Sequence, residues 1–269
     1  MALLAFPEPY DFEISTERFR VFGPDLANLW HDGGLHRVVG GAEVRIEAAP
    51  GGVDVEPLDD ETLPVVLKLL GAEYDLPSFY AWAAEQPVLG EVVTRVTGFR
   101  PPLAPDPYES LVTSITAQQV SLFAAFAIRN RLLERFGERG EHAYAFPTRA
   151  RMAAAREEEL VALGFSRRKA EYVLGVARAE IDLDALALLD DDEVRARLTA
   201  IRGIGAWTAE WFLARHLARP RAWPAGDLAL RKAAAVLYGL DVHALGPLLD
   251  PFQNLSAHYL LTGMRVAAA

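Results

Sequence analysis

The sequence predicts an α+β protein, in which a small antiparallel β-sheet domain with helices is followed by an all-helical region. Strand-type runs separated by glycines dominate residues 12–57. Beyond Pro105 the strand signals stop, and an alanine-rich pattern with helical periodicity takes over. The 269 residues suffice for one large domain or two modest ones. We therefore expect domains at 1–100 and 101–269, joined by the proline-rich stretch 98–106.

The first domain opens with a run over residues 12–22, where loosely alternating apolar and polar side chains predict a strand. Three shorter strands are expected at 35–39, 42–48 and 53–56. Glycine pairs or a Pro-Gly-Gly triplet precede each of them, as is typical of hairpin turns. Helical patterns follow at 62–70 and 76–86. A small antiparallel sheet with helices on one face accounts for this order of elements.

The second domain contains only helical patterns. We expect helices at 108–136, 149–163, 166–179, 191–199, 206–216, 227–238 and 255–264. Several begin with a recognised start signal, such as Asp106 before Pro107 or Ser166 before Arg167. The acidic cluster 190–193 is best interpreted as a helix N-terminus, where the macrodipole favours negative charge, and not as a metal site.

Composition excludes several classes of protein. The chain has no cysteine, so disulfides, iron–sulfur clusters, thiolate zinc sites and cysteine nucleophiles are absent. The net charge of −10 arises in the first hundred residues, which hold 17 acidic and 7 basic side chains, whereas the remainder holds 20 of each. No apolar run is long enough to span a membrane, and the start lacks a basic leader region. We expect a cytoplasmic protein without a membrane partner.

The most informative stretch begins with Gly203-Ile204-Gly205, which predicts a tight hairpin between two helices. Glycine allows positive φ and leaves backbone N–H groups bare at the start of the following helix. Such amides bind a phosphate oxygen without a basic side chain, so an acidic protein can still hold DNA. A plain connection between two helices is the alternative interpretation.

Two further features follow the hairpin. Asp227 comes after Pro-Ala-Gly and opens a helix, so it is either an N-cap or a rigidly aimed carboxylate. A carboxylate so placed suits stabilisation of an oxocarbenium-like transition state in N-glycosidic bond cleavage. Trp207 and Trp211 lie four residues apart and hence on one helix face. They either pack in the core or form a slot for a flipped-out base.

Together these residues resemble the helix-hairpin-helix DNA glycosylase superfamily, and within it the bacterial 3-methyladenine DNA glycosylase II type. The hairpin and Asp227 match the superfamily's central motif. Three other segments are similar to parts of that type, and they lie at 9–12, 108–121 and 163–170. The resemblance covers nearly the whole chain and implies that the helical region forms two subdomains.

The resemblance implies a role for each motif residue. Asp227 would be the catalytic carboxylate, and Trp207, Trp211 and Leu122 would line the base pocket. Gln119 would fill the hole left by the extruded nucleotide, with Gln118 beside it.

At the hairpin, Gly203 and Gly205 would hold a DNA phosphate. The carbonyls of Thr199, Ile201 and Ile204 would bind a monovalent cation, Na or K, of structural importance only. No cofactor for catalysis is implied. The expected partner is double-stranded DNA containing damaged bases, and the protein is expected to be a monomer.

The reaction subtype follows from one position. Bifunctional members carry a lysine two residues after the second hairpin glycine, where this sequence has Trp207. We therefore expect a monofunctional glycosylase for alkylated purines, such as 3-methyladenine and 7-methylguanine, without lyase activity. The last helix has His258 and Tyr259 where the resemblance leads us to expect a tryptophan, and His258 is interpreted as a surface or packing residue. The alternatives are a glycosylase for oxidised or deaminated purines and a non-catalytic DNA-damage binding module.

Overall fold

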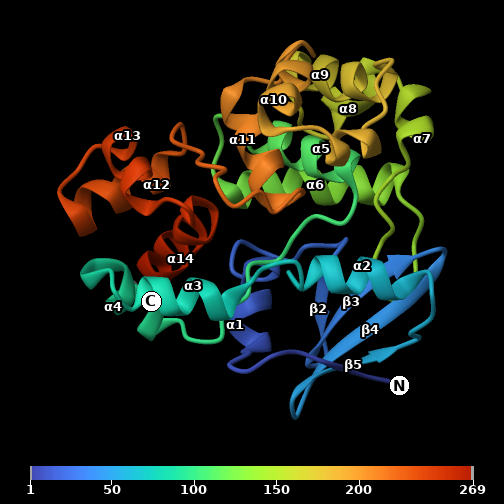
Figure 1. Ribbon diagram of the computed structural model, residues 1–269. Helices are drawn as coiled ribbons and strands as arrows, with labels where there is room; N and C mark the ends of the chain where they lie inside the picture. The colour runs from blue at the N-terminus through green and yellow to red at the C-terminus, as the bar shows by residue number, and fades with distance from the viewer. Residues whose placement is uncertain (1, 268–269) are drawn as a thin grey trace.

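The computed structural model describes residues 2–267 and confirms the α+β class. Figure 1 shows a sheet at the N-terminal end, a helical body of residues 107–215 above it, and a second helical body, which contains the C-terminal helices, beside both. The antiparallel sheet has the strand order β1-β5-β4-β3-β2. Its strands are β1 (Ala2–Ala5), β2 (Leu29–His31), β3 (Gly34–Val39), β4 (Ala42–Ala49) and β5 (Gly52–Glu56). The three strands expected after residue 34 are confirmed, and the edge strands β1 and β2 complete the sheet.

The strand expected over residues 12–22 is wrong. This segment forms helix α1 (Phe12–Thr16) and a 3-10 turn (Glu17–Phe19). Asp11 explains the difference, because its side chain accepts a hydrogen bond from the backbone N–H of Ile14 and caps the helix. Phe12 and Phe19 of this segment pack into the core of the sheet domain.

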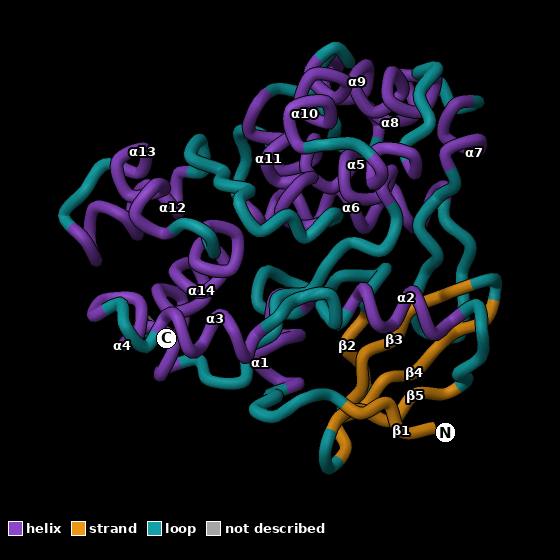
Figure 2. Tube along the Cα trace, viewed as in Figure 1, coloured by secondary structure: helices purple, strands orange, loops and turns teal. Residues whose placement is uncertain are grey.

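The expected helices appear in order, some of them divided, and two helices at 87–95 and 242–245 were not predicted. The helices are α2 (Thr62–Leu69), α3 (Leu76–Ala83), α4 (Pro87–Arg95), α5 (Pro107–Ala117), α6 (Leu122–Phe136), α7 (Arg149–Ala153), α8 (Glu157–Ala162), α9 (Arg167–Arg178), α10 (Asp191–Thr199), α11 (Ala206–Arg215), α12 (Leu228–Ala233), α13 (Val242–Leu245) and α14 (Gln253–Val266). Figure 2 shows that loops and helices make up everything outside the sheet. None of the helices among residues 2–267 is both long and apolar enough to cross a bilayer.

Two of the expected helices are in fact two helices each. The helix expected over 108–136 is interrupted between α5 and α6, where Gln119 takes a φ of 55°. A left-handed residue ends the helical hydrogen-bond ladder, and Ser121 caps the next helix by accepting from the N–H of Ala124. The stretch 149–163 divides into α7 and α8, with Ala154 at the end of the first helix and Arg156 at the N-cap of the second.

Three hydrophobic clusters form the interior. One lies between the sheet and α2, and a second fills the body of α5 to α11. The third joins residues 74–103, which include α3 and α4, to the C-terminal helices α12 to α14. Residues 74–100 thus pack with the C-terminal helices, on the other side of the domain boundary expected at residue 100.

A buried ion network fixes the sheet to the helical body. Glu109 on α5 accepts from Arg37 on β3 at 2.7 Å and from Arg129 on α6 at 2.8 Å. Arg129 also pairs with Asp25, and all four side chains are almost fully buried. Separating the two bodies would leave these buried charges without partners, which is costly. The network therefore holds the sheet and the helical body together.

Candidate active site

Of the two glycines in the hairpin between α10 and α11, one takes the positive φ that was expected. Gly203 takes a φ of +93°, and a Cβ added there would lie 2.1 Å from Cγ of Tyr172. Gly205 takes an ordinary φ of −97° as the N-cap of α11 and has open space around its Cα. Gly203 is therefore required by the fold, whereas Gly205 leaves the start of α11 accessible.

The two glutamines after α5 lie in different surroundings. Gln118 donates from Nε2 to the carbonyl of Gly203 at 3.1 Å and to Oγ1 of Thr208 at 3.2 Å. It therefore ties the end of α5 to the hairpin. Gln119 is exposed at the tip of the turn. Of the two glutamine side chains, Gln119 is therefore the more exposed one.

A cavity of about 480 Å³ lies where the three bodies meet. Leu122, Trp207 and Asp227, three of the predicted site residues, contribute to its wall. Other parts of the wall come from α1, α5, α6 and α14. Residues from both ends of the chain therefore surround the carboxylate singled out from the sequence.

Asp227 is both an N-cap and an aimed carboxylate. Its Oδ1 accepts from the backbone N–H groups of Ala229 at 2.9 Å and Leu230 at 3.1 Å. Its Oδ2 accepts from Nε1 of Trp211 at 3.1 Å. The first two bonds cap α12, and the third fixes the rotation of the carboxyl group. A half-buried anion with three donors is thus held rigidly in the cavity wall.

Trp211 does not form the slot expected from its spacing with Trp207. It is fully buried and is not part of the cavity wall, whereas Trp207 is half-buried and lines it. Trp211 lies one turn deeper along α11, where His258 of α14 packs edge-on against it at 5.8 Å between ring centroids. On the helix face that they share, Trp207 therefore lines the cavity, and Trp211 lies behind Asp227.

Basic groups surround the single carboxylate. The cavity wall includes Arg18, Arg129, Arg215, Lys232 and Arg265, and among the described residues Asp227 is its only acidic member. Burial lowers the pKa of Arg215 to about 9, an effect that Arg18 strengthens and Asp227 opposes. The guanidinium of Arg215 also stacks on Trp211 at 3.4 Å from the ring centroid.

His258 packs against Trp211, so the packing interpretation is confirmed and the surface interpretation is wrong; its place in the cavity wall was not predicted. Burial lowers its pKa well below the usual range, and the charges of Arg215 and Arg18 add to the effect. The imidazole is therefore neutral at neutral pH, and its buried Nε2 has no hydrogen-bond partner within residues 2–267. Arg18 was missed as well, because it lies in the segment expected to be a strand.

Comparisons with known proteins agree with this geometry. Residues 112–244 match the model of the HhH-GPD superfamily base excision DNA repair proteins. The DNA-3-methyladenine glycosylase 1 of Schizosaccharomyces pombe is 32% identical over 60% of this chain and 74% of its own length. The chain belongs to the HhH-GPD superfamily. The matched segment of this superfamily member contains the hairpin, Trp207, Trp211 and Asp227.

Two further proteins that resemble this HhH-GPD protein are both named as 3-methyladenine DNA glycosylases. The DNA-3-methyladenine glycosylase of Bacillus subtilis is 28% identical over 68% of this chain, and the alignment spans 63% of that relative's length. The 3-methyladenine DNA glycosylase of Archaeoglobus fulgidus superposes with a TM-score of 0.87 at 24% identity, over 98% of this chain and 99% of its own. The latter similarity shows that the fold, sheet domain included, extends over both proteins.

Proposed function

We propose that this protein is a monofunctional DNA glycosylase that hydrolyses the N-glycosidic bond of alkylated purines in double-stranded DNA. The observation that carries the proposal is the rigid carboxylate of Asp227 in a cavity beside Trp207 and next to the hairpin. The names of the relatives support 3-methyladenine as a substrate, and 7-methylguanine is included because it too is an alkylated, cationic purine.

Each part of the site has a role in this proposal. The N–H groups at Gly203 and Gly205 would bind a phosphate, and Gln119 would occupy the space of the extruded nucleotide. The base would enter the cavity against Trp207 and Leu122. A π-face attracts an alkylated, cationic purine by about 0.5–2 kcal/mol.

Asp227 would stabilise the sugar cation as the base departs. A cationic purine is already a good leaving group, so no general acid is needed, and a neutral His258 is consistent with this. Water then adds to the anomeric carbon and one proton is released, which gives an abasic site and the free base.

The absence of lyase chemistry is the second part of the proposal. Trp207 occupies the position where bifunctional relatives carry a lysine. Lys169 is buried and donates from Nζ to the carbonyl of Thr116 at 2.9 Å, outside the cavity wall. Lys232 is exposed and contributes to the wall. Borohydride treatment of the enzyme on abasic DNA should therefore give no covalent adduct, and an adduct lost in Lys232→Met would contradict this part.

The proposal includes a structural monovalent cation, Na or K, at the end of α10. The carbonyls of Thr199, Ile201 and Ile204 flank Gly203, and carbonyl oxygens at a helix C-terminus favour a cation. The Ile201 carbonyl accepts one hydrogen bond, from Ile204 N–H at 3.0 Å, and keeps a second lone pair. A bound cation would stiffen the hairpin, while catalysis would use none. The protein would act as a monomer on cytoplasmic DNA.

A lesion panel tests the proposal. Duplexes with 3-methyladenine, 7-methylguanine, hypoxanthine or 8-oxoguanine are incubated with the protein, and free base and alkali-labile sites are measured. We expect release of the alkylated purines. The neutral lesions are included because Arg18 and Arg215 in the cavity wall would repel a cationic base and would not repel a neutral one. Binding to abasic DNA without release of any base would favour a non-catalytic module.

Asp227→Asn is the matching variant, because asparagine still caps α12 while the charge is lost. We expect release to fall at least about 100-fold with duplex binding retained. Asp241→Asn is the control, since Asp241 also caps a helix by accepting from His243 N–H at 2.8 Å and lies outside this cavity.

A further inference from the structure

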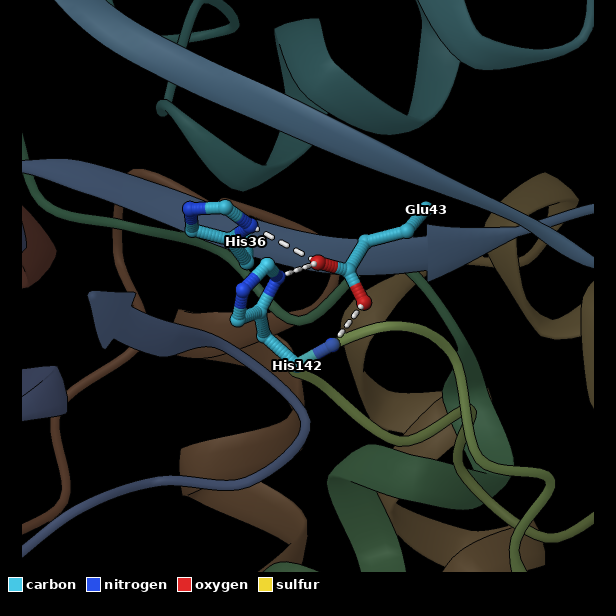
Figure 3. Close-up of side chains that lie close together, drawn as sticks. All are labelled: His36, Glu43 and His142. Carbon is cyan, nitrogen blue, oxygen red and sulfur yellow. Dashed lines mark hydrogen bonds and ion pairs between the residues drawn. The ribbon is translucent and has the colours of Figure 1, made fainter. Parts of the chain in front are cut away.

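Three of the six histidines of the chain gather at the seam between the sheet and the helical body, away from the cavity. His31 ends β2, His36 lies on β3, and His142 belongs to the loop between α6 and α7. The carboxylate of Glu43 on β4 faces both His36 and His142 (Figure 3). None of these four residues is part of the cavity wall around Asp227.

The side chains converge on one carboxylate oxygen. Oε1 of Glu43 lies 2.8 Å from Nδ1 of His36 and 3.0 Å from Nδ1 of His142. One ligand atom from each of the three residues can be chosen so that all lie within 4.8 Å of one another. With metal–ligand bonds of about 2.0 Å, the edge of a tetrahedral zinc site is about 3.3 Å. The two edges that start at Oε1 of Glu43, 2.8 and 3.0 Å, are a few tenths of an ångström shorter than this value, so a small movement of the side chains would admit an ion.

The other oxygen of Glu43 is already fixed. Oε2 accepts from the backbone N–H groups of His142 at 2.8 Å and Ala143 at 2.9 Å. These two bonds turn Oε1 toward the imidazoles, as outer-shell bonds do for metal ligands. The ring of His31 stacks on His142 at 4.4 Å between centroids and is exposed, so it covers the cluster toward solvent.

The cluster has an unexplained polar atom. The side chain of His36 is 6% exposed, and its Nε2 has no hydrogen-bond partner within the described part of the chain. The ring faces Glu43 through Nδ1, so an ion held there would leave Nε2 as the protonated nitrogen, and the case for the ion rests on the Nδ1 and Oε1 atoms. Gly140 lies close as well, and a Cβ there would meet Oε2 of Glu43 at 2.5 Å, so the loop is fitted tightly around the carboxylate.

We propose that His36, Glu43 and His142 bind a zinc ion, with water as the fourth ligand. Two imidazoles and one carboxylate form a donor set that zinc uses in proteins, commonly with a water in the remaining position. On binding, the metal would take the Nδ1 lone pair of each ring in place of the hydrogen bond to Glu43, and a neutral ring would keep its single proton on Nε2.

The ion would join the sheet to the helical body. His36 and Glu43 belong to the sheet, whereas His142 belongs to the loop that leaves α6. That loop already pairs with the first domain, since Tyr144 N–H donates to the carbonyl of Leu26 at 2.8 Å. The metal would therefore stabilise the association of the two bodies and leave base excision unchanged.

The test starts from full-length protein stripped with a chelator and dialysed. Zn²⁺ is titrated against a chromophoric competitor, and Co²⁺ is added separately for its visible absorption. We expect one ion per chain, an absorption band typical of four-coordinate Co²⁺, and a Tm that rises by about 5 °C or more at 100-fold excess over Kd. Base release by the stripped protein should equal that of the loaded protein, which separates this inference from the proposed function.

Variants complete the experiment. His142→Ala should weaken zinc binding at least about 100-fold and abolish the Tm rise, while His243→Ala on α13 serves as the control. Glu43→Gln gives a second, milder variant, because its amide oxygen still accepts from the two backbone N–H groups while the anionic ligand is lost. The inference is overturned if the wild type binds no stoichiometric metal, or if its Tm rise persists in His142→Ala and Glu43→Gln.

Discussion

Trp211 orients the carboxylate of Asp227 through one hydrogen bond, so Trp211→Phe tests how much that orientation contributes to catalysis. The bond joins Nε1 of Trp211 to Oδ2 of Asp227 at 3.1 Å and lies behind the cavity wall. Phenylalanine keeps an aromatic ring but has no donor. A hydrogen bond to a charged group contributes about 1.5–3 kcal/mol, which corresponds to roughly a 10- to 150-fold change in rate.

The measurement is single-turnover release of 7-methylguanine at saturating enzyme, with Tm recorded for each variant. Trp211→Phe should lower the rate by the factor above and keep duplex affinity, because the bonds of Oδ1 to Ala229 and Leu230 still cap α12. Phe212→Leu is the control, since Phe212 is equally buried but stacks on His216 and not on the site. A wild-type rate in Trp211→Phe would refute the orienting role, and an equal loss in Phe212→Leu would assign the effect to core packing.

Three other substitutions test separate parts of the structure. Gln119→Ala should slow base release on duplex DNA at least about 10-fold and leave release from single strands less affected, because only the duplex leaves a gap to fill; equal effects on both would contradict this. Gly203→Ala should lower the free energy of unfolding by at least about 1–3 kcal/mol in denaturant titrations, since its positive φ and the ring of Tyr172 both oppose a Cβ; an unchanged midpoint would contradict it. Burial lowers the pKa of His216 to about 4, so the unfolded chain binds a proton more readily, and stability should fall by up to about 3 kcal/mol between pH 6.5 and pH 4. His216→Gln should flatten that part of the pH profile, and an identical profile would rule out His216 as its source.

Local signals predicted much of the fold. Glycine pairs before β3 and β4 fixed where the hairpins turn, and the caps at Asp106, Ser166 and Asp190 mark three helix starts in the structure. Alternation alone misled at residues 12–22, because a side-chain cap at Asp11 outweighed the weak strand pattern. In this short segment, the N-cap residue was a better guide to the secondary structure than the alternation of apolar and polar side chains.

Contacts between distant segments could not be predicted in this way. Arg18 and His258 face the same cavity although 240 positions separate them. Spacing placed Trp207 and Trp211 on one helix face correctly, but only the packing of α14 shows that Trp211 lies behind Asp227. The cluster of His36, Glu43 and His142 depends on the docking of two bodies, so no spacing in the sequence indicates it.

The charges around the cavity bear on how a damaged base would be chosen. Arg18 and Arg215 lie in the same wall as Asp227, so a cationic purine would meet one carboxylate and several positive groups. The attraction of Trp207 for such a base is worth about 0.5–2 kcal/mol, and repulsion from the arginines acts against it. Tight binding of the cationic base therefore cannot be the main source of selectivity in the proposed reaction. The weakened glycosidic bond and the poor pairing of an alkylated base would select the substrate, while Asp227 acts on the charge that appears as the bond breaks.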